Sequence, residues 1–208
     1  MINQRMQARS RRLAERVVAP LARTGIDPNV LTITGLVLAF PTAVVIALGW
    51  QVAGGVMLLF SAGFDMFDGA VARVSNRRSD FGAFLDSTLD RWGEGVIFTG
   101  LTWYFVDVGA RAETVLALLT LIGSMLISYT RARAEGLGVE CKVGFFQRPE
   151  RLIVLGIALL TPFGVLSGAM WFLAIATQLT AAQRVLHVHS QIERAKKRKA
   201  REDDGNAA

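Results

Sequence analysis

Long apolar segments, separated by short polar ones, run through most of this chain. They cover residues 30–49, 52–72, 82–107, 112–132, 152–166 and 168–187. Most of them approach the roughly 20 residues that a helix needs to cross the hydrocarbon core of a bilayer, and the fifth is shorter. The pattern therefore predicts an all-α integral membrane protein with six transmembrane helices, in a single domain over residues 1–190.

The two ends of the chain have different patterns. Between residues 3 and 23 arginines recur at helical spacing, at Arg5, Arg9, Arg12 and Arg16. Because a helix with a basic and an apolar face lies along a membrane surface, residues 1–25 are expected to form a juxtamembrane amphipathic helix. The C-terminal end is strongly basic, and residues 191–208 are expected to form a solvated, disordered tail near anionic lipid.

The composition agrees with a membrane protein. Of the 208 residues 52% are hydrophobic and only 19% are charged, which leaves too little polar surface for a soluble domain of this length. The net charge of +6 could indicate nucleic-acid binding, but the basic residues crowd into the termini and the inter-helix loops, so no nucleic-acid partner is expected. The single cysteine, Cys141, excludes an intramolecular disulfide.

The charges of the connecting segments predict an orientation. Basic segments follow the second, fourth and sixth apolar segments, whereas the other connections carry no charge or a net negative charge. Positively charged loops remain on the cytoplasmic side of a membrane. We therefore expect a multi-pass protein of the cell membrane with both termini in the cytoplasm.

Four aspartates gather where the second and third predicted helices meet on the cytoplasmic side. Asp65 and Asp68 are three residues apart, and Asp86 and Asp90 are four apart, so each pair shares a helix face. The short link through Gly82 makes the two helices antiparallel neighbours, which allows the four carboxylates to converge at the membrane interface. Unpaired carboxylates would cost several kcal/mol each to desolvate there.

Divalent metal ions would remove that cost. Ligands that are all oxygen favour hard cations, so Mg²⁺ or Mn²⁺ is expected, with Ca²⁺ as a further possibility. Four carboxylates suit two ions that hold the attacking and leaving oxygens of a phosphoryl transfer. Gly69 and Ala72 leave space for a diphosphate, and Arg73 could neutralise a phosphate.

Two other interpretations of the aspartates stay open. They could be separate interfacial charges at helix ends, which is the role expected of Asp80. They could also belong to the ion path of a cation transporter. Such a path would continue across the membrane, but no comparable charge lies near the outer half of any predicted helix.

The stretch that carries the aspartates resembles the signature of the CDP-alcohol phosphotransferase family, D-x2-D-G-x2-A-R-x8-G-x3-D-x3-D. All positions and spacings agree, at Asp65, Asp68, Gly69, Ala72, Arg73, Gly82, Asp86 and Asp90. The resemblance implies an enzyme that moves a lipid phosphate from a CDP-linked lipid to an alcohol and releases CMP. It also implies a homodimer.

The same resemblance implies roles for individual residues. Asp65, Asp68 and Asp86 would be metal ligands, with two metal ions in each active site. Asp90 would be the general base and would also touch a metal. The residues that would contact the CDP group are Asn29, Val30, Leu31, Thr32, Gly69, Arg73 and Ser79.

The acceptor alcohol must be recognised outside this signature. Arg131, Arg151 and Arg184 lie near the inner ends of the last three predicted helices, where a cluster of cations could bind a phosphorylated alcohol. Ordinary anchoring by positive loop residues is the alternative, and it applies most to Lys142 and Arg148. The position of these residues alone leaves both possibilities open.

Within the family, "LDSTLDR" and "SYTRARAE" followed by "RPERL" resemble two groups of prokaryotic enzymes. These are the phosphatidylinositol phosphate synthases of actinobacteria and the archaeal inositol-phosphate lipid synthases. The residues that would hold inositol phosphate are then Ser128, Arg131, Arg151 and Arg184. Because the position of Arg131 is often lysine in the actinobacterial enzymes, glycerol 3-phosphate stays open as the acceptor. CDP-diacylglycerol is the expected donor, and an archaeal diether is the alternative.

Overall fold

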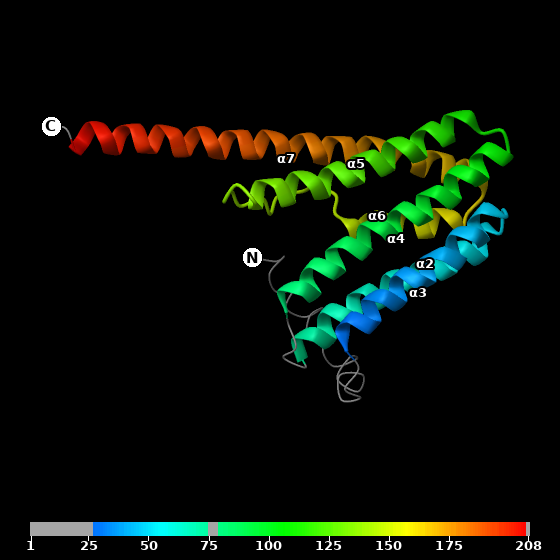
Figure 1. Cartoon of the computed structure of the whole chain (residues 1–208). Coiled ribbons are helices and arrows are strands. Elements are labelled where there is room, and N and C mark those ends of the chain that lie inside the picture. Colours follow the sequence, from blue (N-terminus) through cyan, green and yellow to red (C-terminus); the bar gives the residue numbers. More distant parts are fainter. Residues whose placement is uncertain (1–26, 75–78, 207–208) are drawn as a thin grey trace, which may run out of the picture.

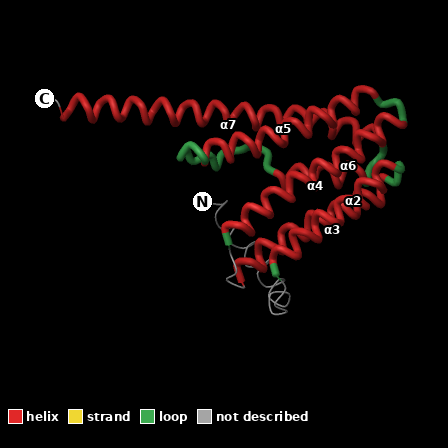
Figure 2. Tube along the Cα trace, in the orientation of Figure 1, coloured by secondary structure: helices red, strands yellow, loops and turns green. Residues whose placement is uncertain are grey.

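The computed structural model describes residues 27–74 and 79–206 of the chain. Over these residues the fold is entirely helical, with turns and loops between the helices (Figure 2). The helices are α2 (Pro28–Ala47), α3 (Gln51–Val74), α4 (Asp80–Asp107), α5 (Arg111–Glu135), α6 (Arg148–Leu159) and α7 (Phe163–Asn206). The expected all-α architecture is confirmed, whereas the predicted surface helix over residues 1–25 lies outside the described residues.

Two of the helices begin where the sequence supplies capping residues. The side chain of Asp27 accepts a hydrogen bond from the backbone N–H of Asn29 at 2.9 Å, and Pro28 takes the first position of α2. In α4 the Oγ of Ser79 accepts from the backbone N–H of Gly82 at 3.0 Å. Each such cap stabilises a helix by about 1 kcal/mol. The first turns of α2 and α4 are therefore well defined, and both lie near the predicted site.

Small residues allow the helices to approach one another closely. α2 packs against α3 and α4, α5 packs against α4 and α7, and α6 packs against α3 and α7. A Cβ atom added to Gly100 of α4 would overlap the backbone of Ala43 in α2, and one added to Gly123 of α5 would lie 2.5 Å from Thr177 Oγ1 in α7. Close contact of this kind holds helices together where lipid provides no hydrophobic drive.

The outside of the bundle is apolar. Among the described residues, three helical segments are long and apolar enough to cross a membrane, at Asn29–Ala47, Arg111–Glu135 and Phe163–Arg198. Large apolar side chains also point outward on several helices, among them Val44, Phe60, Trp103, Ile122 and Leu179. Contiguous apolar surface of this extent suits lipid and would be a liability in water.

The turn between the last two helices lies inside the fifth apolar segment, close to residues 161–164, where the sequence TPFG predicts an outer turn. α6 ends at Leu159, short of the predicted residue 166, and α7 begins at Phe163. Pro162 separates them, because proline has no N–H with which to continue a helix.

The C-terminal segment also differs from its expected disorder. α7 continues to Asn206 and projects beyond the rest of the bundle (Figure 1). The segment is rich in alanine, lysine, arginine and glutamate, which have high helix propensity. In addition, Lys196 pairs with Glu193 at 3.1 Å, one turn away on the same face. These local preferences favour helix over coil.

Candidate active site

The predicted metal ligands lie on two consecutive helices. Asp65 and Asp68 are in the C-terminal part of α3, and Asp86 and Asp90 are in the first turns of α4. Only a short link joins the helices, so the backbone brings both pairs to one end of the bundle (Figure 1). The side chains of Asp65 and Asp68 lie outside the described residues. Among the described side chains, no group of three His, Cys, Asp or Glu residues comes together that could hold a metal ion.

Most of the residues predicted to contact CDP lie at the starts of α2 and α4. The Asn29 Oδ1 atom lies 3.2 Å from the place that a Cβ on Gly82 would take, and the Ser79 Oγ atom lies 3.0 Å from it. Gly82 therefore allows the first turns of the two helices to meet. Thr32, one turn along α2, lines a pocket together with Asp90. The other predicted contacts are Val30, Leu31, Gly69 and Arg73, and the last two have side chains outside the described residues.

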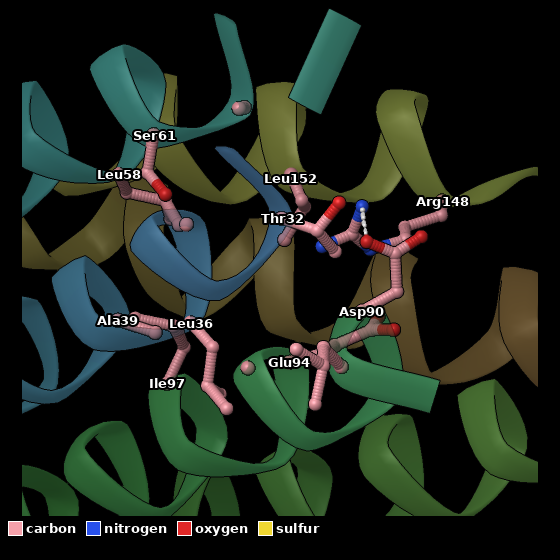
Figure 3. Close-up of a pocket in the computed structure, with 14 residues that line it drawn as sticks. Thr32, Leu36, Ala39, Leu58, Ser61, Asp90, Glu94, Ile97, Arg148 and Leu152 are labelled. Atoms are coloured by element: carbon pink, nitrogen blue, oxygen red, sulfur yellow. Dashed lines mark ion pairs between the residues drawn. The ribbon is translucent and has the colours of Figure 1, made fainter. Parts of the chain in front are cut away.

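The pocket lies between α2, α3, α4 and α6 (Figure 3). At its polar end the Nη1 atom of Arg148 donates to Asp90 Oδ1 at 2.8 Å, and about a fifth of each side chain is exposed, 23% and 19% respectively. Thr32 and Ser61 add hydroxyl groups to the lining. The remaining lining is largely apolar, and includes Leu36, Ala39, Leu58, Ile97 and Leu152. The lining thus combines a charged end with an apolar end.

A second ion pair lies one turn further along α4. The carboxylate of Glu94 accepts from Nε and Nη2 of Arg151 at 2.9 and 3.1 Å, and Ser124 Oγ accepts from the same Nη2 at 2.8 Å. Only 1% of the Glu94 side chain and 2% of the Arg151 side chain are exposed. A buried arginine needs such a partner, because the desolvation of an uncompensated charge costs several kcal/mol.

The other residues expected to bind the acceptor are Arg184, Arg131 and Ser128, and their surroundings differ. Arg184 of α7 is buried and donates to the carbonyl oxygens of Val143, at 2.8 Å, and Ile127. Arg131 is exposed and pairs with Glu135 at 2.9 Å. Arg151 contacts α5 at Ser124, Arg184 contacts it at Ile127, and Arg131 lies one turn beyond Ile127 on the same helix. Ser128 is half-buried on α5, between Ile127 and Arg131.

Glu94 and Arg148 are the residues that the sequence analysis did not assign to the site. Arg148 was open to interpretation as an anchoring residue, but in the structure it contacts Asp90. A signal for Glu94 does exist, since Asp86, Asp90 and Glu94 recur every four residues and share one face of α4. A carboxylate within an apolar helix also implies a cationic partner.

Comparison with protein families matches residues 26–185 to the CDP-alcohol phosphatidyltransferases. The chain belongs to this family. It is 38% identical over 187 residues to the phosphatidylinositol phosphate synthase of Mycobacteroides abscessus, with 85% of each chain covered. It is 34% identical over 197 residues to the archaetidylinositol phosphate synthase of Methanothermobacter thermautotrophicus, with 92% of this chain and 98% of that one covered.

Solved structures agree with this assignment. The crystal structure of Mycobacterium tuberculosis phosphatidylinositol phosphate synthase with CDP-DAG bound matches with a TM-score of 0.77 and 36% identity, over 85% of this chain and 94% of that one. A structure of the same enzyme in complex with manganese and citrate matches with a TM-score of 0.75, at 36% identity over 84% of this chain and 88% of that one. The chain is therefore a CDP-alcohol phosphatidyltransferase of phospholipid synthesis, and its apolar helices make it a multi-pass membrane protein.

Proposed function

We propose that this phosphatidyltransferase transfers the phosphatidyl group of CDP-diacylglycerol to inositol phosphate, with release of CMP. The product would be phosphatidylinositol phosphate. The observation that carries the proposal is the pocket in which Asp90 contacts Arg148, with a charged end toward the start of α4 and an apolar end toward Leu58 and Ile97. Arg151 donates to Glu94, which lines the pocket, and together with Arg131 and Arg184 it would offer cations to a phosphorylated acceptor.

The residues present fit a pair of hard divalent cations. Asp86 and Asp90 share one face of α4 and would offer their carboxylate oxygens, and Asp65 and Asp68, which precede them on α3, would be the other ligands. The carboxylate of Asp90 forms an ion pair with the guanidinium of Arg148 in this structure. Oxygen ligands of this type prefer Mg²⁺ or Mn²⁺. Two such ions would stabilise the negative charge of the diphosphate and of the departing CMP.

The chain's own residues would orient the two substrates. The first turn of α2, from Asn29 to Thr32, would contact the CDP group together with Ser79 at the start of α4. Gly69 and Arg73 would contact it from α3. Asp90 would accept the proton of the acceptor hydroxyl as that oxygen attacks the β-phosphorus of the donor. Arg148 lies against Asp90 and would hold the carboxylate in place until the acceptor arrives.

The membrane arrangement is part of the proposal. All six described helices would span a prokaryotic cell membrane, with both termini and the active site on the cytoplasmic side. Residues 1–25 would lie along the membrane surface, and two copies would form a homodimer. The alternation of basic and non-basic connections supports this orientation.

Two variants of the reaction compete with this proposal. The first variant uses an archaeal diether as the lipid donor. Relatives named as phosphatidylinositol phosphate synthase and as archaetidylinositol phosphate synthase match at similar identity, 38% and 34%. Transfer to glycerol 3-phosphate is the second, because the aspartate signature does not specify the acceptor. The alternative of a cation transporter is not supported, because the family to which the chain belongs consists of phosphatidyltransferases.

An acceptor panel tests the proposal. Purified protein in detergent would receive CDP-diacylglycerol and Mg²⁺ with either inositol 1-phosphate or glycerol 3-phosphate, and CMP release would be measured. We expect kcat/KM to be at least about tenfold higher with inositol 1-phosphate, which corresponds to about 1.4 kcal/mol in the barrier. CMP release with glycerol 3-phosphate alone would refute the inositol assignment. A CDP-diether donor in parallel reactions would identify the lipid preference.

A further inference from the structure

The ion pair of Glu94 and Arg151 fixes a guanidinium inside the bundle. Arg151 donates through Nε and Nη2 to both carboxylate oxygens of Glu94, and through Nη2 to Ser124. Contact through two parallel hydrogen bonds defines the plane of a guanidinium as well as its position. Arg151 of α6 is therefore tied to α4 and α5 at once. Its Nη1 atom makes only a long contact, 3.5 Å, to the carbonyl oxygen of Phe146.

Arg184 of α7 contacts the neighbouring turn on the same face of α5. Arg151 contacts α5 at Ser124, and Arg184 contacts it at Ile127, three residues further on. Both arginines also donate to carbonyl oxygens of the segment between α5 and α6, at Phe146 and Val143 respectively. Two guanidinium groups from different helices are thus held side by side against α5 and this segment.

The two arginines differ in whether a carboxylate neutralises their charge. Glu94 neutralises Arg151, but among the described residues no carboxylate pairs with Arg184, which is only 5% exposed and bonds to carbonyl oxygens. A buried cation with neutral partners alone is costly, and an adjacent anion offsets that cost. An anion beside Arg184, next to the Nη1 edge of Arg151 that Glu94 does not contact, would offset that cost.

We propose that Glu94 is a positioning residue for the acceptor phosphate and that it acts through Arg151. The inference rests on the proposed function, which supplies a phosphorylated acceptor. With Glu94 present, Arg151 has one orientation beside Arg184, and its Nη1 can meet a phosphate oxygen. Without the carboxylate, Arg151 is a buried cation held by Ser124 and a carbonyl, and it leaves this orientation.

Steady-state kinetics of Glu94→Gln test the inference, with KM measured separately for the acceptor and for CDP-diacylglycerol. Loss of charge-assisted hydrogen bonds should raise the acceptor KM at least about tenfold, while the donor KM stays within about twofold. Glu94→Asp keeps the charge but is one methylene shorter, and should give an intermediate acceptor KM. In an Arg151→Gln background, Glu94→Gln should add nothing, because the residue through which it acts is gone.

Two further variants complete the design. Glu113→Gln is the matched control, since Glu113 accepts a hydrogen bond from Ser167 at 2.6 Å and lies eleven residues before Ser124 on α5, about 16 Å away along the helix. It should leave both KM values within about twofold of wild type. If Glu94→Gln does not fold, Ser124→Ala takes its place, because it removes a bond to Arg151 without a change of charge. Its acceptor KM should rise about threefold.

The outcomes separate this inference from the proposed function. A wild-type enzyme that releases CMP with no phosphorylated alcohol overturns the proposed function, and the positioning role with it. A wild-type enzyme that uses inositol 1-phosphate or glycerol 3-phosphate allows the inference to be judged with that acceptor. An unchanged acceptor KM in Glu94→Gln, an equal rise in both KM values, or additive effects with Arg151→Gln would each overturn the positioning role alone.

Discussion

Replacement of Asp90 by asparagine separates its chemical role from its structural one. Asparagine has nearly the same shape, and its side-chain oxygen can still accept the hydrogen bond that Arg148 Nη1 donates to Asp90 at 2.8 Å. The change removes one negative charge from a pair whose side chains are 19–23% exposed. For a pair that is partly screened by solvent, we expect a loss of about 1 kcal/mol in folding stability.

The expected loss of activity is much larger. A positioned general base contributes about 10²- to 10⁴-fold to a rate, which corresponds to roughly 3–5 kcal/mol in the barrier. Because Asp90 is also a proposed metal ligand, Asp90→Asn should fall at the upper end of this range. The assay is CMP release at saturating CDP-diacylglycerol, acceptor and Mg²⁺, with thermal unfolding in detergent as the measure of stability.

Asp107→Asn is the matched control for this experiment. Asp107 is the last residue of the same helix, α4, and it is exposed at the opposite end. Its replacement removes the same charge and should leave turnover within about twofold of wild type. If Asp90→Asn folds normally and retains more than about a tenth of wild-type turnover, Asp90 is not the general base.

The remaining predictions concern packing and metal. Gly100→Ala should lower the thermal midpoint in detergent, because the new Cβ would overlap the backbone of Ala43 and overpacking costs about 1–3 kcal/mol. Gly168→Ala in α7 should not lower it, because nothing lies within 4 Å of the added carbon, and equal midpoints for the two variants would contradict the close approach of α2 and α4. Removal of divalent ions with EDTA should abolish CMP release, and Mg²⁺ or Mn²⁺ should restore it. Turnover that survives EDTA would contradict a metal-dependent reaction.

The apolar segments predicted most of the helical architecture, and local capping signals in the sequence agree with where two of the helices begin. Asp27 and Pro28 mark the start of α2, and Ser79 marks the start of α4, because capping and the missing N–H of proline act within a few residues. The spacing of Asp86 and Asp90 likewise determines that they share a face of α4. The C-terminal segment was harder to predict, because a basic composition suits both a solvated coil and an exposed helix.

The contacts between distant helices could not be predicted in the same way. Glu94 and Arg151 are 57 residues apart, and their periodicity shows which face of a helix each occupies but not which helix lies opposite. Arg148 looked like an anchoring residue for a similar reason, since its partner Asp90 is on a helix that is not its neighbour in the chain. Arg184 was expected to face the site, and its bonds to two carbonyl oxygens emerge only from the packing of α7 against α5.

Identification of the lipid product tests the central claim most directly. Purified enzyme would be incubated with CDP-diacylglycerol, inositol 1-phosphate and Mg²⁺, and the extracted lipids would be analysed by mass spectrometry while CMP is quantified. The account predicts phosphatidylinositol phosphate and CMP in equal amounts. CMP without a new phosphorylated inositol lipid, or a lipid product only when glycerol 3-phosphate is supplied, would contradict it.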